Sequence, residues 1–307
     1  MLLAAAALGV SIASTSSAAL LIHEPFAYTG TGTAGDNAFL GDGNQSGATG
    51  LTGNWRQVNG TVNEIEVDSG GLTFTDGGGN ALPASGGHAR KAVRQGQNSA
   101  SSNVSVFSTS ELTKDNSTMW MSFIFQDNGF SGPTSALMLA SEDMTASDGH
   151  SLITNGYGVG IVIRATANPL RAIHTGYYNG GTNYTRVAEA TPTFESNAGP
   201  QNTSFLLAAK VNWKPDGQLD EIFVFNITDL TTEPLESAAL ASDTFDMLLV
   251  NQQSLDVLNI GETQIDSYDE IRFATTFTEV VGGTVPEPSS LALLGLGGLG
   301  LILRRRR

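Results

Sequence analysis

The stretch Thr118–Asp127, TMWMSFIFQD, decides the fold class of this 307-residue chain. In an extended strand, successive side chains point to opposite faces. One face of this stretch takes the odd-numbered positions 119–125, which are all Met or Phe, and the other takes the even-numbered positions 120–126. This alternation predicts a β-strand with a large apolar face that must pack against another layer.

Working outward, four more stretches have the same apolar, strand-like pattern, and no long helical periodicity separates them. They are GYGVGIVIRA (156–165), SFLLAAKVNW (204–213), LDEIFVFNIT (219–228) and DEIRFATTF (269–277). KPDG at 214–217 predicts a hairpin turn between two of them, because Pro and Asp-Gly suit its corners. A short helix is expected within 235–249. An antiparallel β-sandwich accounts for this order of elements.

The composition agrees with an all-β body and narrows the classes of function. Glycine supplies 36 residues, which suits a chain with many tight turns. Cysteine is absent, so thiol nucleophiles, disulfides and cysteine zinc sites are excluded. The net charge of −15 would repel nucleic acid, so a nucleic-acid partner is not expected.

The two ends of the chain have the pattern of targeting segments. Residues 1–19 combine an apolar run with small residues at cleavage-compatible spacing, which predicts a signal peptide and passage through the export machinery. Near the other end, Leu291–Leu303 holds no charge, and a helix of that length covers only about 20 Å of the ~30 Å hydrocarbon core. Arg304, Arg305, Arg306 and Arg307 then act as a membrane stop.

Pro286, Glu287 and Pro288, followed by this apolar segment and the arginines, resemble the PEP-CTERM sorting signal. The resemblance implies a transient inner-membrane anchor with a short transmembrane helix at 289–303. It also implies processing by a partner enzyme, an exosortase-type membrane protease or transpeptidase, in bacteria that make extracellular polysaccharide. A plain tail anchor is the alternative.

The body resembles bacterial concanavalin A-like (laminin G-like) jelly rolls in HEPFAYTGTG, MWMSFIFQDNG, AAKVNWKPDGQLDEIFVFN and the closing YDEIRFATTF. The expected domains are therefore a signal peptide (1–19), a jelly-roll β-sandwich (20–281) and a sorting signal (282–307). The last comprises the motif 286–288, the apolar helix 289–303 and the basic end 304–307. Members of this family often present a concave face to glycans, and many are structural or adhesive.

The strongest candidates for catalysis are Glu64, Glu66 and Asp68, whose i, i+2, i+4 spacing puts three carboxylates on one face of a strand. Jelly-roll glycoside hydrolases use paired carboxylates about 5 Å apart, but their acid pattern differs here in identity and spacing. A solvent-facing acidic strand explains these residues better, and no enzyme activity is expected.

Two kinds of binding site remain open. Asp143, Asp148 and Asp269 lie in acid-rich segments that could supply oxygen ligands to calcium, although no complete calcium loop is present and no cofactor is otherwise expected. Tyr177, Tyr178 and Tyr184 could offer flat rings to a sugar, and extracellular polysaccharide is the corresponding partner.

The sequence thus predicts an exported, non-enzymatic surface or matrix protein with weak carbohydrate binding. After transient anchoring in the inner membrane, it would reside in the cell envelope or the extracellular matrix. A secreted jelly-roll glycoside hydrolase and a purely structural surface protein are the alternatives.

Overall fold

The computed structural model describes residues 20–28, 38–39, 48–59, 65–83, 86–91, 98–126, 134–144, 156–167, 170–179, 193–195, 204–262 and 266–282. Residues Ala19–Thr284 form one compact unit. The predicted signal peptide, sorting motif, apolar helix and basic end lie outside the described residues. Within the described ranges, no helix is long and apolar enough to cross a membrane.

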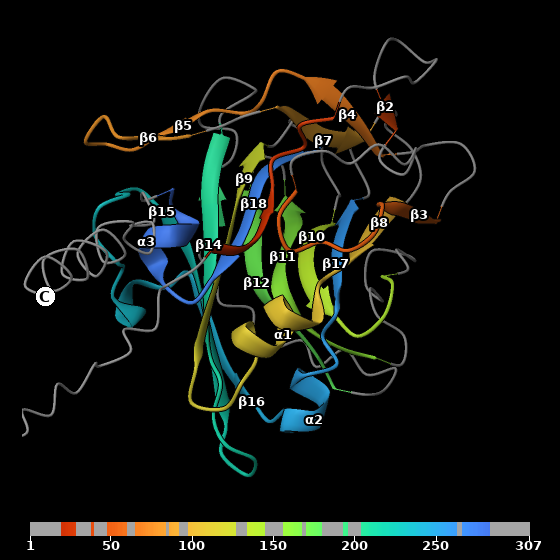
Figure 1. The fold of residues 1–307 in the computed structure, drawn as a ribbon. Coiled ribbons are helices and arrows are strands. Elements are labelled where there is room, and N and C mark those ends of the chain that lie inside the picture. Colours follow the sequence, from red (N-terminus) through yellow and green to blue (C-terminus); the bar gives the residue numbers. More distant parts are fainter. Residues whose placement is uncertain are drawn as a thin grey trace, which may run out of the picture. The chain divides into compact units, whose positions relative to one another are not determined.

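The first of two large sheets has nine strands among the described residues, and all neighbouring strands are antiparallel (Figure 1). In spatial order they are β16 (Ala241–Phe245), β15 (Asp220–Ile227), β14 (Ser204–Asn212), β9 (Thr118–Gln126), β18 (Ser267–Ala274), β7 (Gly87–Lys91), β4 (Ile65–Ser69) and β2 (Ala38–Phe39), while β1 (Leu20–Glu24) pairs with β18 off this path.

The second large sheet has seven strands, also antiparallel, and a small two-stranded sheet stands beside the pair. The seven are β13 (Thr193–Glu195), β12 (Leu170–Asn179), β11 (Tyr157–Ala167), β10 (Thr134–Ala140), β17 (Val257–Glu262), β8 (Asn98–Asn103) and β3 (Arg56–Asn59), and the small sheet pairs β5 (Phe74–Thr75) with β6 (Ala81–Leu82). Short helices α1 (Val106–Leu112), η1 (Glu236–Ala238) and α2 (Leu249–Gln252) connect strands, and α3 (Phe277–Val280) follows the last strand, β18.

The two large sheets share one apolar core, which confirms the predicted all-β antiparallel sandwich. The odd-numbered residues of β9, from Met119 to Phe125, pack in this core together with Leu137 and Ile161 of the seven-stranded sheet. The opposite face of β9 is also covered, because Trp120 and Ile124 belong to a second cluster that includes Phe277 of α3. The alternation in TMWMSFIFQD therefore correctly predicts which residues of β9 face the shared core. The opposite face of the strand is buried as well.

The five predicted strands correspond to β9, β11, β14, β15 and β18. The predicted hairpin turn is also confirmed, since β14 and β15 are antiparallel neighbours. Gly217 takes the left-handed backbone conformation there (φ +84°), which a side chain would disfavour. In the same turn the Gln218 amide donates to the Pro215 carbonyl.

The short helix predicted within 235–249 is confirmed over three residues only. This segment holds only the 3₁₀ turn η1, followed by the edge strand β16, and α2 starts at its last residue. Ala241 and Phe245 pack into the sandwich core while β16 pairs with β15. Covering the edge of β15 outweighs the local preference of an Ala- and Leu-rich stretch for helix.

Strand β18 changes partner halfway along one edge. Ser267 and Tyr268 pair with β7, whereas residues 271–274 pair with β1, and β9 lies along the other edge. The register with β9 shifts between Asp269 and Arg272, and Glu270 has a positive φ of 49°. This β-bulge inserts one extra residue between the core residues Tyr268 and Ile271.

Candidate functional site

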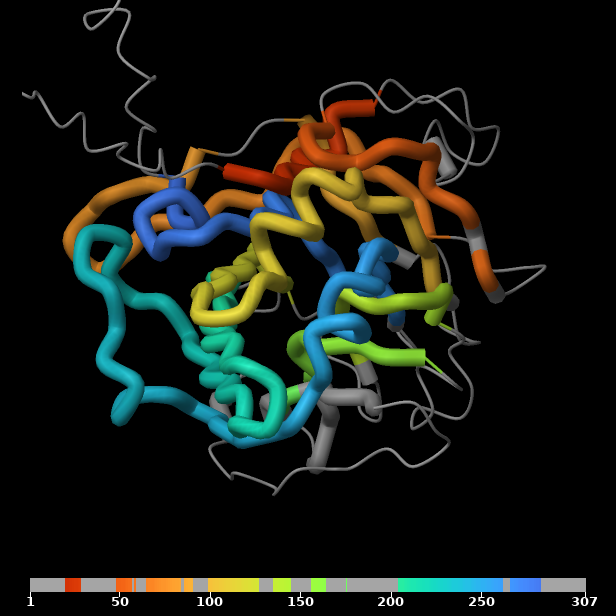
Figure 2. Tube along the Cα trace, turned by 60° about the horizontal axis from the view of Figure 1, so that its bottom comes forward, coloured from red at the N-terminus to blue at the C-terminus, as the bar shows by residue number. Residues whose placement is uncertain are grey.

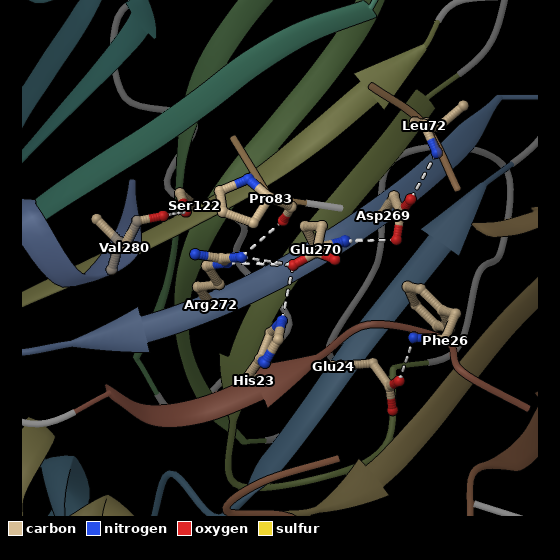
Figure 3. Close-up of polar contacts among 10 residues, drawn as sticks. All are labelled: His23, Glu24, Phe26, Leu72, Pro83, Ser122, Asp269, Glu270, Arg272 and Val280. Atoms are coloured by element: carbon tan, nitrogen blue, oxygen red, sulfur yellow. Dashed lines mark hydrogen bonds and ion pairs between the residues drawn. The ribbon is translucent and has the colours of Figure 1, made fainter. Parts of the chain in front are cut away.

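Three acidic side chains lie in the protein interior at or next to the bulge in β18. Glu24, Asp269 and Glu270 are all fully buried (0% exposed). They come from the first and the last strands of the body, and Figure 3 shows them where β1 pairs with β18. Three buried carboxyl groups are unusual, because removing a charge from water is costly unless it is paired or neutralised.

Glu270 forms the centre of an ion-pair network (Figure 3). Its Oε2 accepts hydrogen bonds from Arg272 Nη2 at 2.7 Å and from Arg272 Nε at 3.2 Å, and it lies 2.7 Å from His23 Nε2. Arg272 Nη2 also donates to the Pro83 carbonyl at 3.0 Å. The ion pair of Glu270 and Arg272 thus joins β1, β18 and the segment after β6.

Asp269 is held by backbone groups. Its Oδ2 accepts from the Leu72 amide at 2.6 Å, and its Oδ1 accepts from the Glu270 amide at 2.7 Å. Burial, reinforced by the neighbouring charge of Glu270, raises the pKa of Asp269 to about 8. Asp269 is therefore mainly protonated at neutral pH, which reduces the number of buried negative charges.

Glu24 has its own set of donors. Its Oε1 accepts from the Phe26 amide at 2.7 Å, and its Oε2 accepts from Trp55 Nε1 at 2.8 Å and from the Tyr28 hydroxyl. Burial raises the pKa of Glu24, and these hydrogen bonds act in the opposite direction. Sequence analysis missed Glu24; the available signal was an acid at the end of the apolar strand sequence LLIHE.

The contacts of Glu24, Asp269 and Glu270 are structural, and together these residues form a clamp that holds β1 against β18. A raised carboxyl pKa often marks a general acid. A general acid must also reach a substrate, and Glu24, Asp269 and Glu270 have no exposed surface. What the contacts do achieve is to tie β1 and the loop residues Leu72 and Pro83 to the closing strand.

The two described acids proposed from sequence as catalytic, Glu66 and Asp68, do not form an accessible pair. Glu66 is 5% exposed in β4, which differs from the solvent-facing position expected for it. Asp68 lies two residues further along the strand and pairs with Arg90 Nε at 2.5 Å. Glu64 lies outside the described residues.

The two calcium candidates among the described residues, Asp143 and Asp269, have different partners. Asp143 forms a two-pronged ion pair with Arg56, with the Nε to Oδ2 distance at 2.9 Å. Asp269 is enclosed in the acidic cluster, and Asp148 lies outside the described residues. In the part of the chain that is described, no group of three or more His, Asp or Glu side chains could hold a metal ion.

Two of the three tyrosines lie in a strand of the seven-stranded sheet. The register of β12 against β11 places Tyr177 opposite Val159, a core residue, and Tyr178 opposite Gly158. Position 178 is therefore paired with a glycine that is itself buried. Tyr184 lies outside the described residues.

The tail and the body give different results in comparison with known proteins. Residues 284–307 match the PEP-CTERM protein-sorting motif, which confirms the predicted sorting signal at the C-terminus. This motif marks a protein for export and for processing at the membrane, and it implies recognition by an exosortase, a membrane protein. None of the curated proteins matches the chain.

Among solved structures, the chain is similar to several carbohydrate-related proteins at low identity. A β-glucanase from Bacillus licheniformis is 11% identical, with a TM-score of 0.37, over 78% of this chain and 99% of that chain. The Ca²⁺/Man3GlcNAc-bound exoplasmic/lumenal domain of VIP36 is 10% identical (TM-score 0.37; 68% and 86%). Peanut lectin is 11% identical (TM-score 0.32; 68% and 91%). At these scores, no ligand or activity transfers to this chain.

Proposed function

We propose that this protein is a non-enzymatic component of the bacterial cell surface or extracellular matrix, and that it is the substrate of its membrane processing enzyme. The tail match at residues 284–307 carries the proposal. The apolar segment 289–303 holds the exported body at the inner membrane until the chain is cut at or near Pro286-Glu287-Pro288. The exosortase supplies the nucleophile for that step.

The state of the described acids supports a body without catalytic activity. A glycoside hydrolase needs one carboxyl group to donate a proton and another to attack or to activate water, both open to the substrate. Here Asp68 is engaged by Arg90, and Glu66 is buried. Burial raises the pKa of Asp220 to about 6 and that of Asp269 to about 8, but both side chains are enclosed by protein.

The experiment that tests the proposal measures intact mass and location in the native host. We expect the normal protein to lose about its last 20 residues and to leave the inner membrane, as the position of the motif requires. A variant with Pro286, Glu287 and Pro288 replaced by Ala should keep its full mass and remain in the inner membrane. Ser289→Ala with Ser290→Ala is the matched control beside the motif and should be processed normally. An uncut normal protein would refute the sorting role.

Weak glycan binding is the second part of the proposal, and Tyr178 is the residue chosen to test it. Tyr178 lies in β12 and is paired with Gly158 of β11. Aromatic rings offer the flat apolar faces on which a sugar can stack.

A glycan array, with and without calcium, tests this binding. Tyr178→Ala should abolish the signal, whereas Tyr178→Phe should retain it because the ring is kept. Binding that is equal in both variants would exclude this location. If the unmodified protein binds no glycan in either condition, the purely structural alternative is favoured.

A further inference from the structure

The two ends of the folded body lie next to each other. Leu20 begins β1 and pairs with Ala274 of β18. At the other end, Gly282 packs so closely against Arg272 that a Cβ atom there would lie 2.9 Å from Arg272 Nη1. Arg272 in turn stands opposite His23 of β1. Both chain ends therefore leave the body beside β1.

Helix α1 lies on the other flank of this strand (Figures 1 and 2). The Ser108 hydroxyl donates to the Leu21 carbonyl at 2.9 Å, which fixes α1 against β1. In both views β1, in red, runs between α3, in blue, and α1, in yellow. The helix, the strand and both chain ends thus belong to one side of the body.

The first turn of α1 projects two apolar side chains into solvent. Val106 is 82% exposed and Phe107 is 68% exposed, whereas Ser108, Thr109 and Leu112 of the same helix are buried. Ser105 caps the helix, its Oγ accepting from the Ser108 amide at 3.1 Å, so the turn is held in place. Nothing in the fold of the described residues requires apolar side chains at positions 106 and 107.

The chain beyond Gly282 limits how far this side can be from a membrane. Six residues, 283–288, separate Gly282 from the apolar segment that starts at Ser289. Fully extended, the seven Cα–Cα steps from Gly282 to Ser289 span at most about 25 Å. When the apolar segment is inserted, as the proposed function requires, Gly282 must lie within that distance of the bilayer.

Charge restricts the kind of lipid. The charge of Glu111 on α1 is neutralised by Lys114, just beyond the end of the helix, whose Nζ contacts Glu111 Oε2 at 2.6 Å. The whole chain carries a net charge of −15, so an anionic lipid surface would repel it. A zwitterionic surface carries no such penalty and accepts exposed Val and Phe side chains at its interface.

We propose that Val106 and Phe107 dock this side of the body onto a zwitterionic bilayer surface while the C-terminal segment is held in the membrane. The inference rests on the proposed function, because the tail supplies the tether. Docking orients the body with its chain ends toward the membrane, and it keeps the sorting motif between the body and the bilayer, where a membrane-embedded enzyme can reach it.

The absence of cysteine makes this docking directly measurable, because one introduced cysteine carries the only label. Val106→Cys and Phe107→Cys, in the full chain, would be labelled with an environment-sensitive fluorophore and reconstituted into phosphatidylcholine vesicles containing doxyl-labelled lipid. Thr244→Cys is the control: it is exposed on β16, the sheet edge four strands from β18. At about 4.8 Å per strand, this control lies roughly 19 Å from β18.

We expect labels at 106 and 107 to be quenched by the doxyl lipid at least about threefold more than the label at 244, with a blue-shifted emission, as for side chains in the interface. Equal quenching at the three sites in vesicles that float with the protein would overturn docking and leave the membrane anchor intact. If the chain does not float with the vesicles, the anchor fails and docking fails with it. A blue shift that appears without lipid and grows with protein concentration would assign this surface to a second copy and also overturn the proposal.

Discussion

Replacing Asp269 by Asn should change how the stability of this protein depends on pH. The carboxyl group of Asp269 is fully buried and receives hydrogen bonds from the amides of Leu72 and Glu270. Burial and the neighbouring Glu270 raise its pKa from 3.8 to about 8 in the folded protein. The unfolded chain, by contrast, holds this proton only below about pH 4.

The sign and size of the effect follow from this difference. Because the folded-state pKa is raised, the stabilisation is fully present below the unfolded pKa and is lost as pH rises through about 8. One pKa unit corresponds to about 1.4 kcal/mol, so the shift amounts to at most roughly 6 kcal/mol, part of which Glu270 and Glu24 share. We expect the normal protein to lose about 3 kcal/mol or more of unfolding free energy between pH 5 and pH 9.

Urea denaturation at a series of pH values measures this loss, with the fluorescence of the buried Trp55, Trp120 and Trp213 as the probe. The Asp269→Asn variant should flatten the profile between pH 5 and 9. Asp76→Asn is the matched control, because the Leu230 amide and the Asn80 side chain lower the pKa of Asp76 to about 2. Its contribution is lost only as pH falls below about 4, so the slope above pH 5 should persist. A flat profile in the normal protein, or an unchanged slope in Asp269→Asn, would refute the reasoning.

Two further substitutions test the clamp around β1. Arg272→Leu leaves the buried Glu270 without its arginine partner and should lower the free energy of unfolding, measured in urea, by about 3–5 kcal/mol. Adding Glu270→Gln should restore a large part of this loss. A loss below about 1 kcal/mol would contradict the role of this ion pair. Gly50→Ala puts a Cβ 1.9 Å from the Leu21 carbonyl oxygen at a positive φ and should cost about 3 kcal/mol or more, whereas Gly70→Ala, at φ +90° with open space, should cost only about 1 kcal/mol. Equal melting temperatures for the two alanine variants would show that the contact with β1 is not rigid.

The sequence alone was sufficient where a pattern is local. The alternation from Met119 to Phe125 identifies a strand and its core face because side-chain direction in a strand has a period of two. The turn at Pro215–Gly217 follows from residue types that set φ directly. The prediction of a helix within 235–249 held for three residues only. The Ala and Leu residues there favour helix locally, but residues 241–245 instead pair with the edge of β15 as a strand, and no local pattern indicates that edge.

The buried cluster was not predictable for a different reason. His23 and Glu270 are 247 positions apart, and nothing in either neighbourhood indicates the other. The bulge is hidden as well, since a positive φ is rare for Glu and the sequence DEIRF reads as regular alternation. Asp269 was noted as a possible oxygen ligand for calcium, and only the contacts with Leu72 and Glu270 show that its carboxyl group is used internally.

The pairing of β1 with β18 has a consequence for the time course of folding. The first strand of the body has no complete partner until the last has been made, and contacts between such distant residues are slow to form because a long loop must close first. A chain interrupted before Ser267 would leave His23 and Glu24 without β18. β1 and β18 therefore stay unpaired until the last strand of the body has been synthesised. Their pairing requires that the chain has been made through to Ala274, ten residues before the start of the sorting motif match.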